Sequence, residues 1–394
     1  MIEDQQKRSI HYHPLFSLGF RPFFLGAAIF SVISIALWSA IFNFQLSVPI
    51  KNISIFQWHA HEMIYGYGIA VITGFLLTAI KNWTGKQTLH GIPLIILFCL
   101  WVGARILFLF GTKYIAIAAF FDITFAFYLG IALAYPIIQV KQWKHLLILA
   151  KIILLITGNI CFYLGAFGYL ENGAYLAIYG GLYLIIGLIM TIGRRVIPFF
   201  IERGVGYEVQ LFNSRWIDIP NIVMFLIFFI SELFLSNHAL TASMALGLFL
   251  TNTIRLYGWH THGIWRIPLL WSLFISMVFI DIGFILFALT YFTNISKYIA
   301  VHAFAFGGIG IITLSMMSRV SLGHTGRNIN SPSNLIKYAL IVLTAGAIFR
   351  VGLPLLNTDY HLIWIAISQS LWIVAYLLFV IVYTPILTQA RADA

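Results

Sequence analysis

The sequence predicts an all-α polytopic membrane protein with twelve transmembrane helices and no soluble domain. Of its 394 residues, 61% are hydrophobic and only 9% are charged, whereas a soluble domain carries about 25% charged residues. Its apolar runs are long enough to cross a bilayer, which takes about 20 helical residues. Glycine, proline, asparagine and charged residues separate these runs. We therefore expect one transmembrane domain over residues 1–394.

The positions of the helices follow from the apolar runs and the residues that bound them. The runs place the spans near 23–44, 59–81, 91–110, 115–138, 146–168, 175–197, 217–235, 238–258, 268–291, 296–319, 335–356 and 360–385. The tightest connection is predicted between Leu235 and His238, and the longest loop from Arg194 to Trp216. Stripes of small residues, such as Gly66, Ala70 and Gly74, predict close approach of helix backbones.

The distribution of lysine and arginine predicts that both termini are cytoplasmic. Most basic residues lie in connections on one side, and only Lys51, Lys113 and Lys297 fall on the other. The net charge of +11 is therefore explained by topology, and nucleic acid is not expected as a partner. The two cysteines lie inside apolar runs and form no CxxC motif, which excludes a disulfide framework and covalent haem attachment.

One stretch, Gln57 to Gly85, carries the strongest functional signal. His59, His61 and Glu62 stand at the start of an apolar run, and ionisable groups within a membrane helix indicate a functional site. Its part from His61 to Gly85 is matched by His302 to Gly326, because 24 positions separate the first and last residue of each. The two segments share the leading histidine, Gly66/Gly307, Thr84/Thr325, Gly85/Gly326 and a following base. Two helices are thus expected to present a histidine at the same depth.

These histidines predict a haem site near the outer face. Residues two apart on a helix point about 200° from each other, so His59 and His61 cannot both ligate one metal. His61 and His302, on facing helices between apolar walls, form the arrangement that a haem with two axial histidines needs. Arg105 and Arg350 are the cations expected near its propionates. In the alternative interpretation, the histidines hydrogen-bond each other or Glu62, and the arginines pair with Asp122 or Asp281.

The cytoplasmic side holds a second group of histidines and a belt of arginines. His11-Tyr-His13, His260-Thr-His262 and His324 could supply imidazoles to copper or zinc, although their spacing closes no four-ligand site. The candidate metal ligands of the whole chain are His61, His302, His59, His13 and His324. The basic belt is explained by topology and lipid headgroups, with a second anionic ligand as the alternative; it comprises Arg21, Arg194, Arg195, Arg319 and Arg327.

Six motifs resemble one known family, over nearly the whole chain. They are LGFRPFFL (18–25), WHAHEM (58–63), GFLLTAIKNWTG (74–85), RRVIPFF (194–200), PLLW (268–271) and MSRVSLGHTGR (317–327). Together they resemble the NnrS family, which is polytopic, contains haem and copper, and is tied to the bacterial response to nitric oxide and nitrosative stress. The resemblance implies a multi-pass protein of the bacterial cytoplasmic membrane.

The resemblance also implies which residues matter, without saying which bind haem and which bind copper. The family-type positions are His13, Arg21, His59, His61, Glu62, Arg105, Arg195, His302, Arg319, His324, Arg327 and Arg350. One departure bears on copper: many members carry a histidine shortly after PLLW, where this chain has Leu273-Phe274. The axial histidines on spans two and ten are similar to those of the haem–copper oxidase main subunit, which has three pseudo-repeats of four helices. Spans six and seven lack the histidines of that copper centre, which argues against a proton-pumping oxidase.

Three hypotheses for function follow. The first is a membrane protein with b-type haem, and copper as a secondary metal, that acts in nitric oxide metabolism or protection through redox chemistry or nitric oxide binding. Its redox partner is not predicted. The second is a twelve-helix proton-coupled transporter of a metal or small anion, using Glu62, Asp122, Asp281, Arg105 and Arg350. The third is an assembly factor for respiratory complexes.

Overall fold

Twelve apolar helical spans make up the fold in the computed structural model, which describes residues 13–235, 237–357 and 359–393. In a bilayer every backbone N–H and C=O must find its partner inside the chain, which a helix achieves within one segment. Over the described residues, eleven helices are long and apolar enough to cross a membrane, and the twelfth, Ile92–Phe108, is shorter. The chain is a multi-pass membrane protein.

Several spans are built from two or three helical pieces. The spans are α1 (Phe20–Phe44), α2–η2–α3 (Ile55–His61, Glu62–Gly68, Ile69–Thr84), α4 (Ile92–Phe108), α5 (Ile115–Gln139), η3–α6 (Trp143–His145, Leu146–Ala166), α7 (Gly173–Gly204), α8–η4 (Arg215–Ile230, Ser231–Leu235), α9 (His238–Trp259), α10 (Pro268–Phe292), α11–η6–α12 (Lys297–His302, Ala303–Gly310, Ile311–His324), α13–η7–α14 (Asn334–Ala347, Ile348–Gly352, Leu353–Leu356) and α15 (His361–Thr388). Short 3₁₀ helices, η1 (Pro14–Phe16) and η5 (His262–Arg266), lie in the connections.

The predicted spans are confirmed in number, order and position, with two corrections. The predicted loop from Arg194 to Trp216 is wrong, because α7 continues through Pro198 to Gly204 and only residues 205–214 connect it to α8. The span predicted to end near residue 319 is longer, because α12 remains helical to His324. In both places the helix extends beyond the apolar run, so hydropathy alone ends the span too early.

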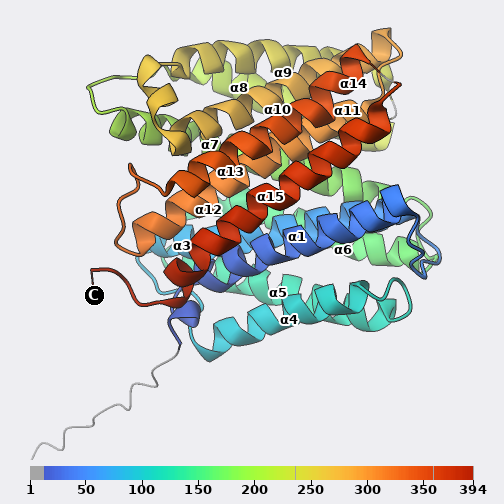
Figure 1. Cartoon of the computed structure of the whole chain (residues 1–394), viewed down its shortest axis with the longest axis horizontal. Coiled ribbons are helices and arrows are strands. Elements are labelled where there is room, and N and C mark those ends of the chain that lie inside the picture. The colour runs from blue at the N-terminus through green and yellow to red at the C-terminus, as the bar shows by residue number, and fades with distance from the viewer. Residues whose placement is uncertain (1–12, 236, 358, 394) are drawn as a thin grey trace, which may run out of the picture.

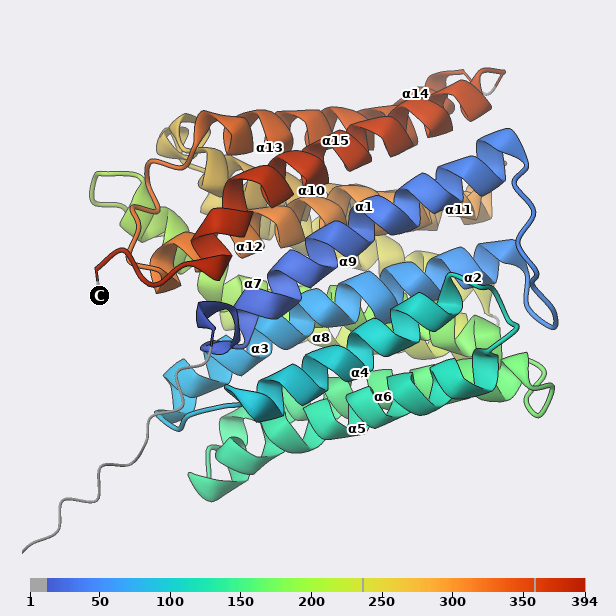
Figure 2. The same cartoon turned by 60° about the horizontal axis from the view of Figure 1, so that its bottom comes forward.

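Figures 1 and 2 show the spans running alongside one another. In Figure 1, α8 and α9 lie along the upper edge of the bundle, and α4 and α5 lie along the lower edge. We call one end of the bundle the His61 end; it holds the connections 45–54, 109–114, 167–172 and 293–296. The opposite, His324 end holds connections 85–91, 205–214 and 325–333, together with residues 13–16 and 389–393. That the His324 end is cytoplasmic stays a prediction, as does the oxidase-like grouping of helices.

The two matched segments have the same local structure. Each histidine is followed at once by a π-helix, Glu62–Gly68 after His61 and Ala303–Gly310 after His302. Each segment ends in a glycine with left-handed backbone, φ +67° at Gly85 and +74° at Gly326. This conformation favours glycine, which has no Cβ to clash. The correspondence seen in the sequence is therefore also a structural one.

Glycines set the closest helix contacts, as the small-residue stripe predicted. A Cβ at Gly74 would lie 2.8 Å from two ring atoms of Phe24 on α1, and one at Gly66 would lie 2.6 Å from Phe30. The stripe therefore seats the span Ile55–Thr84 against α1. Between α6 and α7 the contact is backbone to backbone, since a Cβ at Gly173 would lie 2.8 Å from the amide nitrogen of Gly165.

Gly173→Ala is therefore expected to destabilise the protein by about 1–3 kcal/mol, because backbone atoms cannot yield as a side chain would. Gly180→Ala, on the same helix, is the matched control. Its added methyl group would meet only Leu233 Cδ1, at an ordinary 3.5 Å, and alanine favours the helix. Thermal unfolding in detergent compares the two variants. Equal melting temperatures would show that α6 and α7 are not held at this distance.

Candidate functional site

The position of His61 is set by the start of its span. Ser54 caps α2, accepting a hydrogen bond from the Gln57 amide at 3.1 Å while the Gln57 side chain accepts one from the Ser54 amide at 2.8 Å. This capping box fixes the first turn, and His59 and His61 follow in the next. The histidines then leave α2 on different faces, as predicted, and enter two separate clusters.

His61 lies in the first cluster and is completely buried, at 0% exposure. Its Nδ1 is 3.0 Å from Glu62 Oε1, and its Nε2 is 2.9 Å from the amide oxygen of Asn159 on α6. The ring stacks between Phe162, at a centroid distance of 4.0 Å, and Phe108, at 4.9 Å. Both nitrogens and both faces of this imidazole are therefore engaged by the protein.

Arg105 connects the carboxylates of this first cluster. Its Nη1 bonds to Glu62, and its Nη2 lies 2.6 Å from Asp122 Oδ2 on α5. Tyr163 donates a further hydrogen bond to the same oxygen of Asp122, at 2.9 Å. All four side chains are buried. This is the alternative interpretation of the sequence, in which a histidine bonds to Glu62 and an arginine pairs with Asp122.

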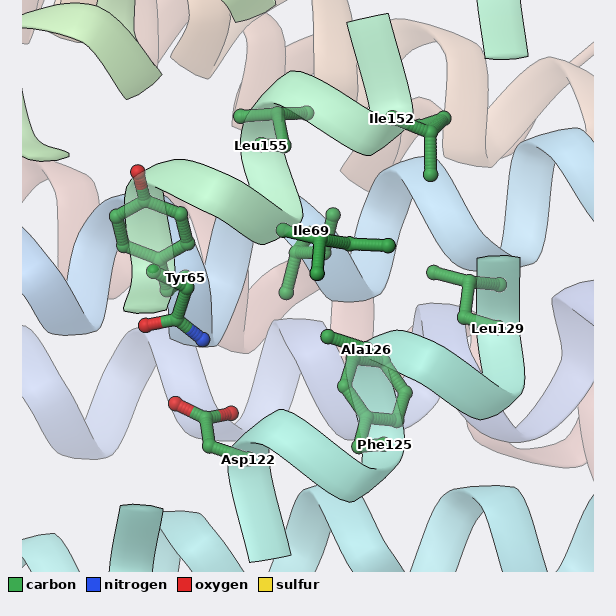
Figure 3. Close-up of a pocket in the computed structure, with 10 residues that line it drawn as sticks. Tyr65, Ile69, Asp122, Phe125, Ala126, Leu129, Ile152 and Leu155 are labelled. Carbon is green, nitrogen blue, oxygen red and sulfur yellow. The ribbon is translucent and has the colours of Figure 1, made fainter. Parts of the chain in front are cut away.

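The space beside this network is small. Figure 3 shows Asp122 and Tyr65 at one end of a pocket whose other labelled residues are apolar, Ile69, Phe125, Ala126, Leu129, Ile152 and Leu155. The cavity measures about 10 Å³, which is room for a single water molecule. Asp122 Oδ1, buried without a partner among the described residues, is the group that such a water would satisfy. The first cluster is a closed polar network.

The second cluster contains His59, His302 and Arg350. His59 stacks flat on Trp38 of α1, with ring centroids 4.4 Å apart and planes 6° from parallel. Its Nδ1 is buried and has no hydrogen-bond partner among the described residues. Arg350 lies close to both histidines. Each of the three residues is only partly buried, so a ligand could reach the cluster from outside the chain.

The contacts of His302 define which of its nitrogens carries the proton. Its Nδ1 is 2.6 Å from the carbonyl oxygen of Tyr298, one turn back on α11, so this nitrogen carries the proton and donates. The other nitrogen, Nε2, is then unprotonated, and it accepts a hydrogen bond from Arg350 Nη2 at 2.8 Å. A backbone carbonyl holding one imidazole nitrogen is the arrangement that fixes the tautomer of metal-ligating histidines. No carboxylate pairs with Arg350 among the described residues.

The histidines of the other end are separate again. His13 Nδ1 accepts a hydrogen bond from the Leu15 amide at 3.3 Å, and His324 lies beside Phe20, with ring centroids 5.8 Å apart. His11 lies outside the described residues. Within residues 13–235, 237–357 and 359–393, no three His, Cys, Asp or Glu side chains gather to hold a metal ion. A copper site at this end stays a prediction.

The family model described as NnrS protein matches residues 14–391, nearly all of the chain. The chain belongs to the NnrS family. Both histidine clusters thus contain residues of the NnrS motif WHAHEM, His59 in one and His61 with Glu62 in the other. No curated protein matches the sequence.

The structure of this NnrS protein separates residues that sequence reasoning grouped. His61 and Arg105 lie in the first cluster, and His302 and Arg350 in the second, so the expected pair of His61 and His302 does not share partners. Asn159 and Tyr163 are functional candidates that sequence reasoning missed. A polar amide within the apolar run of α6 was the available signal, but nothing in the sequence indicated that it faces His61.

Proposed function

We propose that this NnrS-family protein is a haem protein of the bacterial cytoplasmic membrane, acting in the response to nitric oxide, and that His59 and His302 hold the haem. The carrying observation is the second cluster. Among the described residues, His59 Nδ1 has no hydrogen-bond partner, the unprotonated His302 Nε2 contacts Arg350, and Arg350 pairs with no carboxylate. The first cluster supports no such role, because His61 is enclosed by partners and its cavity has room for one water. The proposed haem ligands are therefore His59 and His302, in place of the pair His61 and His302 expected from the sequence.

Each residue of the second cluster has a distinct part in this proposal. The Tyr298 carbonyl keeps Nε2 of His302 unprotonated and available as a ligand, and Trp38 holds the His59 ring in one orientation. Arg350 offers a guanidinium to a propionate, for which its planar fork of donors is suited. Arg350 donates a hydrogen bond to His302 Nε2 in this structure, and haem binding at that nitrogen requires the hydrogen bond to break. When bound, haem supplies one-electron chemistry, and nitric oxide binding where an axial position is free. We assign no copper site.

Optical spectra of the purified protein, oxidised and reduced, test this assignment in the wild type and in three alanine variants. We expect a haem band in the wild type that is lost or becomes high-spin in His59→Ala and in His302→Ala. The His61→Ala variant should keep the wild-type band at reduced stability, since His61 belongs to the closed network. Loss of the band in His61→Ala but not in His59→Ala would restore the pairing expected from the sequence.

A proton-coupled transporter remains the second candidate, favoured by a specific observation. Within the bilayer span the chain buries Glu62 and Asp122, each with an oxygen that has no partner among the described residues, and Asp281 has another. Buried carboxylates of this kind serve proton pathways. A protein that purifies colourless after haem-sufficient expression, and whose transport of a metal or small anion is lost in Glu62→Gln, would establish this second function instead.

A further inference from the structure

Arg319, on α12 towards the His324 end, is a buried cation with no counter-ion among the described residues. Its side chain is 7% exposed. Its Nη1 is wholly buried with no hydrogen-bond partner among the described residues, and no carboxylate of that part of the chain acts on its charge. Its guanidinium lies over the ring of Phe200 on α7, with the ring centroid 4.0 Å from the guanidinium carbon.

Other buried arginines show what Arg319 lacks. Arg21 donates to the carbonyl oxygens of Leu387 and Gln389 at 3.2 and 2.5 Å. Arg105 bonds to two carboxylates. Arg255 pairs with Asp218 at 3.0 Å and with the side chain of Asn252 at 2.7 Å.

The carboxylates near this end that form contacts are already engaged. Glu202 accepts from the Leu211 amide at 3.0 Å, Asp218 pairs with Arg194 and Arg255, and Asp393 pairs with Arg391 at 2.7 Å. Their geometry leaves none directed at Arg319. A counter-ion must come from outside the described residues.

An unpaired guanidinium removed from water is strongly destabilising, and one aromatic ring offsets only part of that cost. Phe200 covers one face of the cation and leaves the in-plane N–H groups for a ligand. A planar fork of donors matches the oxygens of a phosphate group. Arg319 is five residues before the end of α12 at His324, which is about 7.5 Å along the helix at 1.5 Å per residue.

We propose that Arg319 is the recognition group of a phosphate-binding site at the His324 end. The phosphate is either a free ion or the headgroup of a phospholipid. The site is separate from the histidine clusters, because Arg319 and His302 are 17 residues apart on one span, about 25 Å at the helical rise. The proposal therefore stands or falls independently of the haem assignment.

Thermal unfolding of the full chain, delipidated in a maltoside detergent and chloride buffer, tests it with two probes. The first is inorganic phosphate and the second is phosphatidylglycerol added to the micelles. We expect one of them to raise the melting temperature of the wild type by several degrees, because a ligand that binds only the folded state stabilises it. In Arg319→Met the rise should vanish. A rise with inorganic phosphate identifies a free ion, and a rise with phosphatidylglycerol alone identifies a lipid headgroup.

Arg203→Met is the matched control, since Arg203 is an exposed arginine beside a phenylalanine, with its guanidinium carbon 5.5 Å from the ring centroid of Phe199. It should respond as the wild type does. Without either probe, Arg319→Met should melt at or above the wild type, because it removes a lone buried charge. Should Arg319→Met fail to fold, Arg319→Lys replaces it, and its response to the probe should be reduced.

Two outcomes would overturn the proposal. The wild type could respond to neither probe, or Arg319→Met could respond as strongly as the wild type. In the first case, a lower melting temperature of Glu3→Gln/Asp4→Asn, at positions outside the described residues, would identify a carboxylate of the chain as the partner of Arg319.

Discussion

Arg105→Met is expected to destabilise the folded protein by about 3–5 kcal/mol, which is the cost of removing one partner of a buried ion pair while the other remains. Arg105 is the cation that Glu62 and Asp122 share. Without it, two carboxylates would remain in a part of the bundle that holds a cavity of about 10 Å³, too small to hydrate them. Equilibrium unfolding in detergent, followed by circular dichroism, measures the loss.

The charge-matched variant Arg105→Met/Glu62→Gln/Asp122→Asn separates charge from packing. It removes the cation and both carboxylates together, and buried ion networks can be replaced by neutral groups at little cost. Most of the lost stability should therefore return. If Arg105→Met alone unfolds like the wild type, the four side chains do not form the network described here.

Arg350→Met is expected to have the opposite profile, with weakened haem retention and an intact fold. Arg350 contacts His302 Nε2 but pairs with no carboxylate among the described residues. Its removal therefore leaves no buried carboxylate without a counter-ion. Losing a group that supports a bound metal typically lowers affinity about 10–100-fold. Titration of haemin into haem-depleted protein, followed by absorbance, gives the affinity.

Arg350→Lys is the control for charge, and it should bind haemin with intermediate affinity because lysine keeps the cation but not the fork. The melting temperature of haem-depleted Arg350→Met should match that of haem-depleted wild type. Wild-type haemin affinity in Arg350→Met would show that this arginine does not face the propionates. Together with Arg105→Met, the experiment assigns different roles to two arginines that sequence reasoning treated alike.

The spans could be predicted because membrane helices are set by local composition. The short connection between Leu235 and His238 and the close helix approach at Gly66 and Gly74 also follow from local sequence, whereas the identity of α1 as the neighbouring helix does not. The site could be predicted only in part. The sequence indicates that His59, His61 and His302 lie at one end of the bundle, but which partner each meets depends on how α6, α11 and η7 rotate about their axes.

The π-helices are one physical reason why the partners of these histidines could not be predicted. A regular helix advances 3.6 residues per turn, and the predicted faces of His61 and His302 assumed that period. Both histidines are followed at once by a π-helix, in which hydrogen bonds skip one more residue and the faces shift. The pairing of His61 with Asn159, and of His302 with Arg350, could not be read from a helical wheel.

The shortness of α4 has a consequence for the surrounding lipid. Its 17 residues give an apolar length of about 25 Å at 1.5 Å per residue, less than the roughly 30 Å of a typical hydrocarbon core. Ile92, Ile96 and Ile106 are exposed on α4. The hydrocarbon layer must therefore become thinner where it meets this edge of the bundle. Such mismatch costs a fraction of a kcal/mol per Å and sorts proteins between membranes of different thickness. The protein should therefore prefer bilayers of shorter-chain lipids, and its α4–α5 edge should be where the membrane around it is thinnest.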